Sequence, residues 1–342
     1  MRFSIVIPVY NVEKYVGKCL ETVMNQTFQD FEVIIVDDET PDDSMAVIQP
    51  FADAHPDRIR IIHQKNTRQG GARNHGASLA RGEYILFLDS DDYFRLDMLE
   101  VIDRCLRENP TDILVFRFAD VTESGKVLRE QDLFGMEPGV YSPREKKELL
   151  LLTNSPADKV YRREFYQGCG FKFPEKLLYE DAAVRILLAK AESIQLCGEI
   201  LYYYVQHEGS TMHIRLTDKM LDILTVTDLI REELQKSGLY TGSEDVLELA
   251  LIRGIQCIIN IINRKDPNSP LQIPMADYIA RNFPGYRENP YISSGMRREL
   301  DTLTAHEFRK YHYRILMVSE LKARLLRWGI VAKLNELRKT LR

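Results

Sequence analysis

The sequence predicts an α/β fold, a doubly wound and mostly parallel sheet followed by a helical C-terminal region. Over the first 118 residues, short apolar runs typical of strands buried on both faces alternate with segments of helical periodicity. From about residue 217 onward the pattern is helical almost throughout. We therefore expect a first domain over residues 1–216, with parts at 1–118 and 119–216, and a helical region over 217–342.

The first part contains five expected strands and four expected helices. The helices carry apolar residues three or four positions apart, as Val12, Val16, Cys19 and Val23 show. The expected strands are 3–9, 31–36, 59–63, 84–88 and 113–118, and the expected helices are 12–24, 42–54, 71–80 and 96–108.

Beyond residue 120 the alternation of strands and helices weakens. Residues 121–143 are polar and contain Gly125, Gly135, Pro138 and Gly139, which predicts loops and short strands. Further expected elements are helices at 144–152 and 180–191, a strand at 202–205, and helices after residue 217 with interruptions at 266–274 and 282–290.

The composition is that of a globular protein, with 44% hydrophobic and 28% charged residues among 342. The net charge of −5 argues against a nucleic-acid-binding protein that relies on a basic surface. The five cysteines lack the spacing of a zinc site, which favours reduced thiols in a cytoplasmic protein. No apolar run approaches the roughly 18 residues that span a bilayer.

The expected strand at 84–88 ends abruptly in acids, Asp89, Asp91 and Asp92. Carboxylates this close repel one another unless a cation or hydrogen-bond donors accept them. Their position at the carboxyl end of a strand is where open α/β sheets bind ligands. The pattern indicates a Mg²⁺ or Mn²⁺ site with phosphate as a further ligand. The alternative is a solvated acidic turn that caps the next helix.

Four groups of residues follow expected strands and should lie along one rim of the sheet. Together they offer an aromatic ring, carboxylates, a glycine-rich turn with Arg73, and the metal site, which suit a nucleotide diphosphate. Each also has an ordinary interpretation as a turn, a solvated loop or a packing glycine, but four on one rim favour the functional one. The groups are Pro8-Val9-Tyr10-Asn11, Asp37-Asp38, the glycine-rich segment 70–76, and Asp89-Ser90-Asp91.

The motifs SIVIPVYN, VIIVDD, GGARNHG, ARGEYILFLDSDD and LLYEDAAV closely resemble those of glycosyltransferase family 2, in the same order and spacing. The resemblance extends over about residues 4–212. It implies the GT-A fold, a single nucleotide-binding α/β domain. It also implies inverting transfer of a sugar from a nucleotide donor, usually a UDP-sugar, to an acceptor hydroxyl.

The resemblance also implies roles for individual residues of the rim. Pro8, Val9 and Tyr10 would line the base pocket, and Asp38 would hydrogen-bond the nucleobase. Asp89 would face the ribose or donor sugar, and Asp91, with Asp89 beside it, would coordinate the metal. One departure is visible, because the family commonly has Gly-Ser-Thr where this chain has Glu39-Thr40-Pro41.

Inverting transfer needs a base that takes the proton of the acceptor hydroxyl. The acidic pair Glu180-Asp181 follows an apolar stretch, so burial and mutual repulsion should raise one pKa. By resemblance Asp181 is the base, and Glu180 supports it or binds the acceptor. The alternative is that both are acids at a helix N-terminus.

Two further segments resemble family features more loosely. Residues 158–163 are similar to the stretch before the acceptor site, and the alternative is a basic surface turn. Residues 207–213 resemble a loop that closes over the donor diphosphate, where His207 or His213 would approach the phosphates or bind the metal. A surface or hydrogen-bonded histidine is the more common situation.

The C-terminal end is strongly basic, because residues 308–342 contain ten Lys or Arg residues and only two acids, Glu320 and Glu336. Apolar residues including Trp328 recur there at helical spacing, which predicts a basic amphipathic helix. Such a helix either lies on an anionic membrane surface or packs on protein, its own domain or a homodimer partner.

The sequence thus predicts a metal-dependent inverting glycosyltransferase of the cytoplasm that acts on a saccharide or lipid-linked saccharide in cell-surface polysaccharide synthesis. One alternative is a nucleotidyltransferase, but residues 9–14 lack the glycine-rich basic signature that would hold a triphosphate. The other is an inactive GT-A scaffold that binds a nucleotide sugar or a partner protein. The retained Asp89, Asp91 and Asp181 argue against it.

Overall fold

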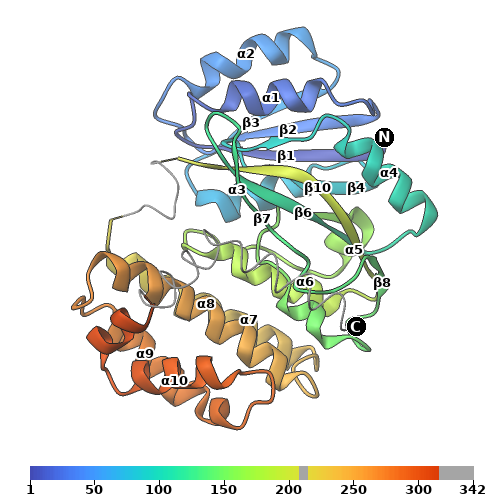
Figure 1. Ribbon diagram of the computed structural model, residues 1–342. Helices are drawn as coiled ribbons and strands as arrows, with labels where there is room; N and C mark the ends of the chain where they lie inside the picture. The colour runs from blue at the N-terminus through green and yellow to red at the C-terminus, as the bar shows by residue number, and fades with distance from the viewer. Residues whose placement is uncertain (208–214, 316–342) are drawn as a thin grey trace. The chain divides into compact units, whose positions relative to one another are not determined.

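The computed structural model describes residues 1–207 and 215–315 (Figure 1). The chain forms two units. The first contains Met1–Arg215 and Thr225–Leu247, and the second contains Leu216–Leu224 and the described part of Glu248–Arg342. Residues 225–247 group with the first unit, so the two units do not divide at one point of the chain. The domain boundary expected near residue 216 stays a prediction.

The first unit is built around one sheet of ten strands, in the order β3-β2-β1-β4-β9-β6-β10-β5, with β7 beside β6 and β8 beside β10. The strands are β1 (Phe3–Val9), β2 (Phe31–Asp37), β3 (Ile59–His63), β4 (Tyr84–Phe87), β5 (Tyr93–Phe94), β6 (Ile113–Thr122), β7 (Val127–Glu130), β8 (Gly139–Tyr141), β9 (Lys159–Arg162) and β10 (Ile194–Gln206).

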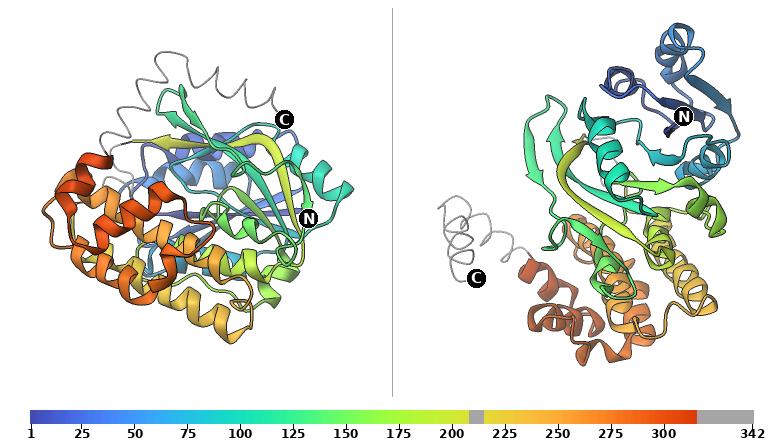
Figure 2. Two further views of the ribbon diagram at one scale, coloured as in Figure 1. Left: turned by 60° about the horizontal axis from the view of Figure 1, so that its bottom comes forward. Right: turned by 90° about the vertical axis from the view of Figure 1, so that its right-hand side faces the viewer.

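Strands β1 to β4 pair in parallel, as do β6 and β10. Strand β9 lies antiparallel between β4 and β6, so six of the ten described strands run in one direction. Figure 2 shows the long pair β6 and β10, the latter in yellow, from two further directions. The predicted doubly wound, mostly parallel α/β sheet is confirmed.

Helices cover both faces of the parallel strands. Helix α1 (Val16–Met24) packs on the face that presents Ile5 and Ile35, within the main hydrophobic core. Helix α3 (Arg68–Ser78) packs on the opposite face, which presents Val6 and Val36 (Figure 1). Burial on both faces explains why these strands are continuous apolar runs. The remaining helices of this part are α2 (Ser44–Ala54) and α4 (Met98–Glu108).

Several elements after residue 120 differ from the sequence predictions. The strand expected at 202–205 is the end of β10, whose regular pairing is interrupted by bulges near Gly198 and Glu199 that hide its length. The expected helix at 180–191 is a 3₁₀ turn and a short helix. These elements are η1 (Lys147–Leu151), α5 (Arg163–Gly168), η2 (Glu180–Ala183) and α6 (Val184–Lys190).

Strand β9 corrects the interpretation of residues 158–163 as a basic surface turn. Lys159 is fully buried, and its Nζ donates to the carbonyl oxygens of Thr153 and Ser155 at 2.9 and 2.8 Å. It also forms an ion pair with buried Asp158. A charged residue can occupy a central strand here because every donor of its ammonium group has a partner.

After residue 217 the described chain is helical, as predicted. In the second unit the core includes Ile255, Ile259 and Leu300, and buried Tyr311 donates a hydrogen bond to Asn260 Oδ1 at 2.7 Å. Of the basic segment expected at 308–342, residues 308–315 are described and helical, and residues 316–342 lie outside the described residues. The helices are η4 (Asp218–Leu221), α7 (Asp222–Lys236), α8 (Glu244–Lys265), α9 (Gln272–Asn282), η5 (Pro284–Arg287) and α10 (Ser294–Thr304).

Within the described parts of the chain, none of the helices has the length and apolar character that crossing a bilayer requires.

Gly76 sets how closely α3 approaches the sheet. A Cβ at this position would lie 2.3 Å from Val6 Cγ1 and 3.2 Å from Val36 Cγ2. We expect Gly76→Ala to lower the free energy of unfolding by about 1–3 kcal/mol, because overpacking outweighs the gain in helix propensity. Urea unfolding measures this change. The matched control is Gly168→Ala in α5, where a Cβ meets nothing within 4 Å. Equal stability of the two variants would contradict this packing.

Candidate functional site

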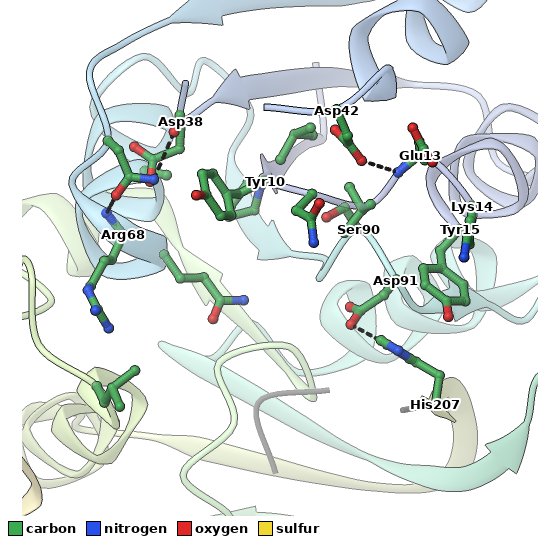
Figure 3. Close-up of a pocket in the computed structure, with 18 of the residues that line it drawn as sticks. Tyr10, Glu13, Lys14, Tyr15, Asp38, Asp42, Arg68, Ser90, Asp91 and His207 are labelled. Carbon is green, nitrogen blue, oxygen red and sulfur yellow. Dashed lines mark hydrogen bonds and ion pairs between the residues drawn. The ribbon is translucent and has the colours of Figure 1, made fainter. Parts of the chain in front are cut away.

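A cavity of about 870 Å³ opens at the carboxyl ends of β1, β2 and β4 (Figure 3). This volume is in the range of sites that hold a small organic ligand. Three of the four groups predicted to share a rim contribute to its wall through the residues named for them, Pro8, Val9, Tyr10, Asp38 and Asp91, and the fourth contributes through Ala72 alone. Beside Ala72 of the glycine-rich segment, its neighbours Arg68 and Gln69 also line the cavity. The described lining residues are Pro8 to Tyr15, Asp38, Asp42, Asn66, Arg68, Gln69, Ala72, Ser90, Asp91, Glu123, Leu177 to Glu180, and His207.

Asp38 is held rigidly at one end of this cavity. Its Oδ1 accepts hydrogen bonds from Gln64 Nε2 at 2.7 Å and from the Thr67 backbone N–H at 2.9 Å. Gln64 is itself fixed, because its Oε1 lies 2.7 Å from His75 Nδ1. A carboxylate fixed through one oxygen can present the other to a ligand N–H group. The sequence pattern did not reveal this support, which comes from residues 26 to 37 positions away.

Two other side chains of the cavity wall lie near Asp38 in Figure 3. Tyr10 follows β1 and is 51% exposed, so its ring is available for stacking on a planar ligand. Arg68 begins α3 with a φ of 65°, a conformation that few non-glycine residues adopt. Arg68 lines the cavity and was not singled out from the sequence.

The loop that departs from the family pattern keeps a glycine-like backbone. Glu39 has a φ of 61°, in the left-handed region where the family commonly has glycine. Thr40 stabilises the turn, since its N–H donates to Asp37 Oδ1 at 2.9 Å and its hydroxyl donates to Asp42 Oδ1 at 2.7 Å. The same hydroxyl accepts the N–H of Asn11 at 2.8 Å. The departure thus changes the side chains of this loop and retains its left-handed residue.

At the other end of the cavity, Asp91 pairs with His207, which follows β10. His207 Nε2 lies 2.9 Å from Asp91 Oδ2, as the dashed line in Figure 3 marks. The hydrogen bond to Asp91 raises the pKa of His207. The imidazole packs against the Tyr15 ring with centroids 4.3 Å apart. Its Nδ1 has no hydrogen-bond partner among the described residues. His213, the alternative candidate, lies outside those residues.

Asp92 takes a different part from its two acidic neighbours. It is 1% exposed and accepts hydrogen bonds from the Val205 N–H at 2.7 Å and from the Tyr202 hydroxyl. Burial raises its pKa well above the usual range, and Asp91 and Asp89 add to that shift. Asp92 therefore ties the acidic turn to β10, two residues before His207. No pattern in the sequence distinguishes the buried acid from its two half-buried neighbours.

Arg73 lies behind the cavity and joins two acidic segments. The guanidinium is 1% exposed, with Nη2 2.7 Å from Asp89 Oδ1 and Nη1 2.9 Å from Glu180 Oε1. Burial alone would lower the pKa of Arg73, but the two carboxylates raise it above its ordinary value. The expected contact of Arg73 with a pyrophosphate stays a prediction, because both terminal nitrogens bond to carboxylates here.

Glu180 and Asp181 form the start of η2, and both have raised pKa values. Burial raises the pKa of Glu180 to about 7, while Arg73 opposes the shift and Asp181 adds to it. Burial also raises the pKa of Asp181, again opposed by Arg73. Glu180 lines the cavity, whereas Asp181, Asp89 and Arg73 are not among the described lining residues. A carboxylate with a pKa near neutrality suits proton transfer at physiological pH.

The pair Asp91 and His207 fits a divalent metal ion. Neighbouring ligands of an octahedral ion with bonds of about 2.1 Å are about 3 Å apart, close to the observed Nε2–Oδ2 separation of 2.9 Å. The described residues contain no group of three or more such side chains that could hold a metal by themselves. The remaining ligands would therefore be water and substrate phosphate, as is usual for Mg²⁺ sites.

Comparisons with known proteins identify the family and the fold. The family profile for glycosyl transferase family 2 matches residues 4–170. Residues 4–170 thus form a glycosyltransferase family 2 domain. The chain is 29% identical over 226 residues to the glycosyltransferase GlyG of Streptococcus pneumoniae, a match that covers 61% of this chain and 72% of GlyG. It is 31% identical over 219 residues to the uncharacterized glycosyltransferase EpsJ of Bacillus subtilis, covering 62% of this chain.

The match spans 63% of EpsJ, less than two thirds of that protein. Among solved structures, S. aureus TarS in complex with UDP-GlcNAc superposes with a TM-score of 0.73, at 24% identity, over 91% of this chain and 90% of that one. At this identity the likeness shows the fold, and it confirms the GT-A fold with a helical region after it.

The raised pKa of Glu180 makes stability depend on pH. A carboxyl whose pKa is about 7 in the folded protein and about 4.5 ordinarily binds its proton more tightly when folded. Its contribution to the free energy of unfolding therefore falls as the pH rises from about 4.5 to 7, by up to about 3 kcal/mol. We expect Glu180→Gln to lose less stability than the wild type between pH 5 and pH 8 in urea unfolding.

The control for this prediction is Glu21→Gln on the exposed face of α1, which should follow the wild type at both pH values. An identical pH dependence in the wild type and in Glu180→Gln would show that Glu180 ionises as an ordinary surface carboxyl.

Proposed function

We propose that this protein is a metal-dependent inverting glycosyltransferase that moves a sugar from a UDP-sugar to a hydroxyl of a saccharide acceptor. The observation that carries the proposal is a single cavity with three different groups on its wall. These are the fixed carboxylate Asp38, the pair Asp91 and His207, and the high-pKa carboxylate Glu180. They match the needs of a nucleobase, a diphosphate and an acceptor hydroxyl respectively.

The nucleotide would bind with its base between Tyr10 and Asp38. The exposed Tyr10 ring offers a stacking surface, with Pro8 and Val9 beside it, and the free oxygen of Asp38 accepts a ring N–H. Arg68, on the same wall, supplies a positive charge for carbonyl or phosphate oxygens. The complex of TarS with UDP-GlcNAc, in a protein of the same fold, supports a UDP-sugar as the donor.

Asp91 and His207 would hold the divalent ion, Mn²⁺ or Mg²⁺, together with the diphosphate. When bound, such an ion stabilises negative charge on the departing diphosphate. Asp89, with Oδ1 held by Arg73 and Gln69, keeps its second oxygen for the ribose, the donor sugar or the ion. The Tyr15 ring and the hydrogen bonds of Asp92 keep His207 in place.

Asp181 would act as the base and Glu180 would orient the acceptor. The acceptor hydroxyl attacks the anomeric carbon as its proton passes to the carboxylate, on the face opposite the departing nucleotide diphosphate. Burial beside Arg73 places both acids in a low-dielectric setting that raises their proton affinity. The acceptor would be a saccharide or lipid-linked saccharide of a cell-surface polysaccharide, met at the cytoplasmic face of the membrane.

Replacing Asp181 tests the assignment of the base. We expect Asp181→Asn to lower the rate of sugar transfer about 10²–10⁴-fold, because the amide cannot accept the proton. Binding of UDP should stay within about twofold of the wild type, since Asp181 is not among the described lining residues. Steady-state kinetics and calorimetry measure the two effects. Transfer at the normal rate in this variant, with loss in Glu180→Gln, would assign the base to Glu180 instead.

Thermal-shift titration with UDP and UDP-sugars, with and without Mn²⁺, tests the donor and the metal. A ligand at 100 times its Kd stabilises the fold by about 2.7 kcal/mol. We expect a metal-dependent shift that falls in Asp91→Asn and in His207→Ala. The control Asp53→Asn, on the exposed face of α2, should keep it. No shift in the wild type with any nucleotide would favour the inactive scaffold.

A further inference from the structure

The glycine-rich motif of α3 contacts the protein rather than the cavity. Of its residues from Gly70 to Gly76, Ala72 is the one that lines the cavity. We propose that Thr67, Gly70, Arg73 and Asn74, termed here the α3 clasp, hold residues 173–181 in place, and that Asn74 is a positioning residue for the acidic pair Glu180-Asp181. This inference rests on the proposed function, because it gives these residues a part in the same reaction.

Asn74 makes the most specific contact of the clasp. Its Nδ2 donates to the Phe173 carbonyl oxygen at 2.9 Å, and its Oδ1 accepts the Phe173 N–H at 2.8 Å. A side-chain amide that satisfies both backbone groups of one residue fixes that residue much as a neighbouring strand would. The separation of 99 positions between the partners makes this a tertiary contact.

The other members of the clasp fasten the same segment along its length. The Thr67 carbonyl oxygen accepts the Lys176 N–H at 3.0 Å, and Arg73 bonds to Glu180 at 2.9 Å. Gly70 allows the close approach, since a Cβ there would lie 2.4 Å from the Pro174 carbonyl oxygen and 2.9 Å from Glu180 Cγ. The motif thus has glycine where residues 173–181 approach the backbone of α3 most closely, and it has polar side chains where it forms hydrogen bonds to that segment.

The held segment has a backbone that needs such support. Lys176 and Tyr179 both have a φ of 62°, in the left-handed region that residues with a side chain rarely adopt. Strained residues persist where surrounding contacts over-determine their conformation. Tyr179 directly precedes Glu180, so relaxation of this strain would move the acidic pair relative to the donor.

The experiment compares Asn74→Ala with the matched control Asn25→Ala, an exposed residue at the end of α1. We expect Asn74→Ala to lower kcat at least tenfold, with the donor KM within twofold and UDP binding retained. Hydrogen exchange of the amides of residues 175–181 should become at least tenfold faster in Asn74→Ala and stay unchanged in the control.

Two more variants separate positioning from a general loss of stability. Asn74→Asp keeps the acceptor for the Phe173 N–H and should lose less kcat than Asn74→Ala, and it replaces that variant if the latter does not fold. Lys176→Asn, added to Asn74→Ala, should restore part of kcat and of the exchange protection, because asparagine adopts the left-handed conformation more readily. Lys176 is exposed and outside the described cavity lining.

Unchanged kcat and unchanged exchange in Asn74→Ala would overturn the proposal. A raised donor KM with normal kcat would also overturn it, because α3 would then serve the nucleotide alone. The exchange measurement needs no substrate. If the wild type transfers no sugar, the proposed function fails while exchange still decides whether the clasp holds residues 173–181.

Discussion

The site depends on the two ion pairs that the buried guanidinium of Arg73 forms with carboxylates. Arg73 is 1% exposed and bonds to Asp89 after β4 and to Glu180 at the start of η2, residues 91 positions apart in the chain. Burying a charge costs several kcal/mol unless well-oriented partners offset it. The carboxylates of Asp89 and Glu180 offset this cost. If either acidic segment moved away, Arg73 would keep a buried charge with one partner fewer, so the fold holds the two segments together beside the cavity.

This arrangement gives the acids of the site different properties. Asp92 is tied into the core by Tyr202 and Val205, with a pKa raised by burial, while Asp91 faces the cavity beside His207. Glu180 has its pKa raised to about 7 even though Arg73 opposes the shift. Under the proposed function, acids of similar chemistry take different roles because their surroundings differ: Asp92 is structural, Asp91 would bind the metal, and Glu180 would orient the acceptor beside the base Asp181.

The sequence predicted the donor side of the site better than the rest. Tyr10, Asp38 and Asp91 each follow an apolar strand, and parallel strands of one sheet bring their carboxyl ends to one edge. The role expected for the glycine-rich segment at the diphosphate stays a prediction, and its packing role was not visible in the sequence, because a glycine in a sequence does not show what approaches it. Here the approaching atoms are the Pro174 carbonyl oxygen and the Glu180 side chain, about one hundred positions away.

By itself the sequence determined the α/β class, the positions of β1 to β4, the family, and the acids that follow the strands at the carboxyl edge of the sheet. These depend on local patterns of apolar and polar residues, which the chain carries wherever it folds. The tertiary structure decided that Lys159 lies in a buried strand, that His207 meets Asp91, and that Arg73 faces carboxylates. Each of these depends on a partner distant in the chain, and no local pattern encodes which charges will meet after burial.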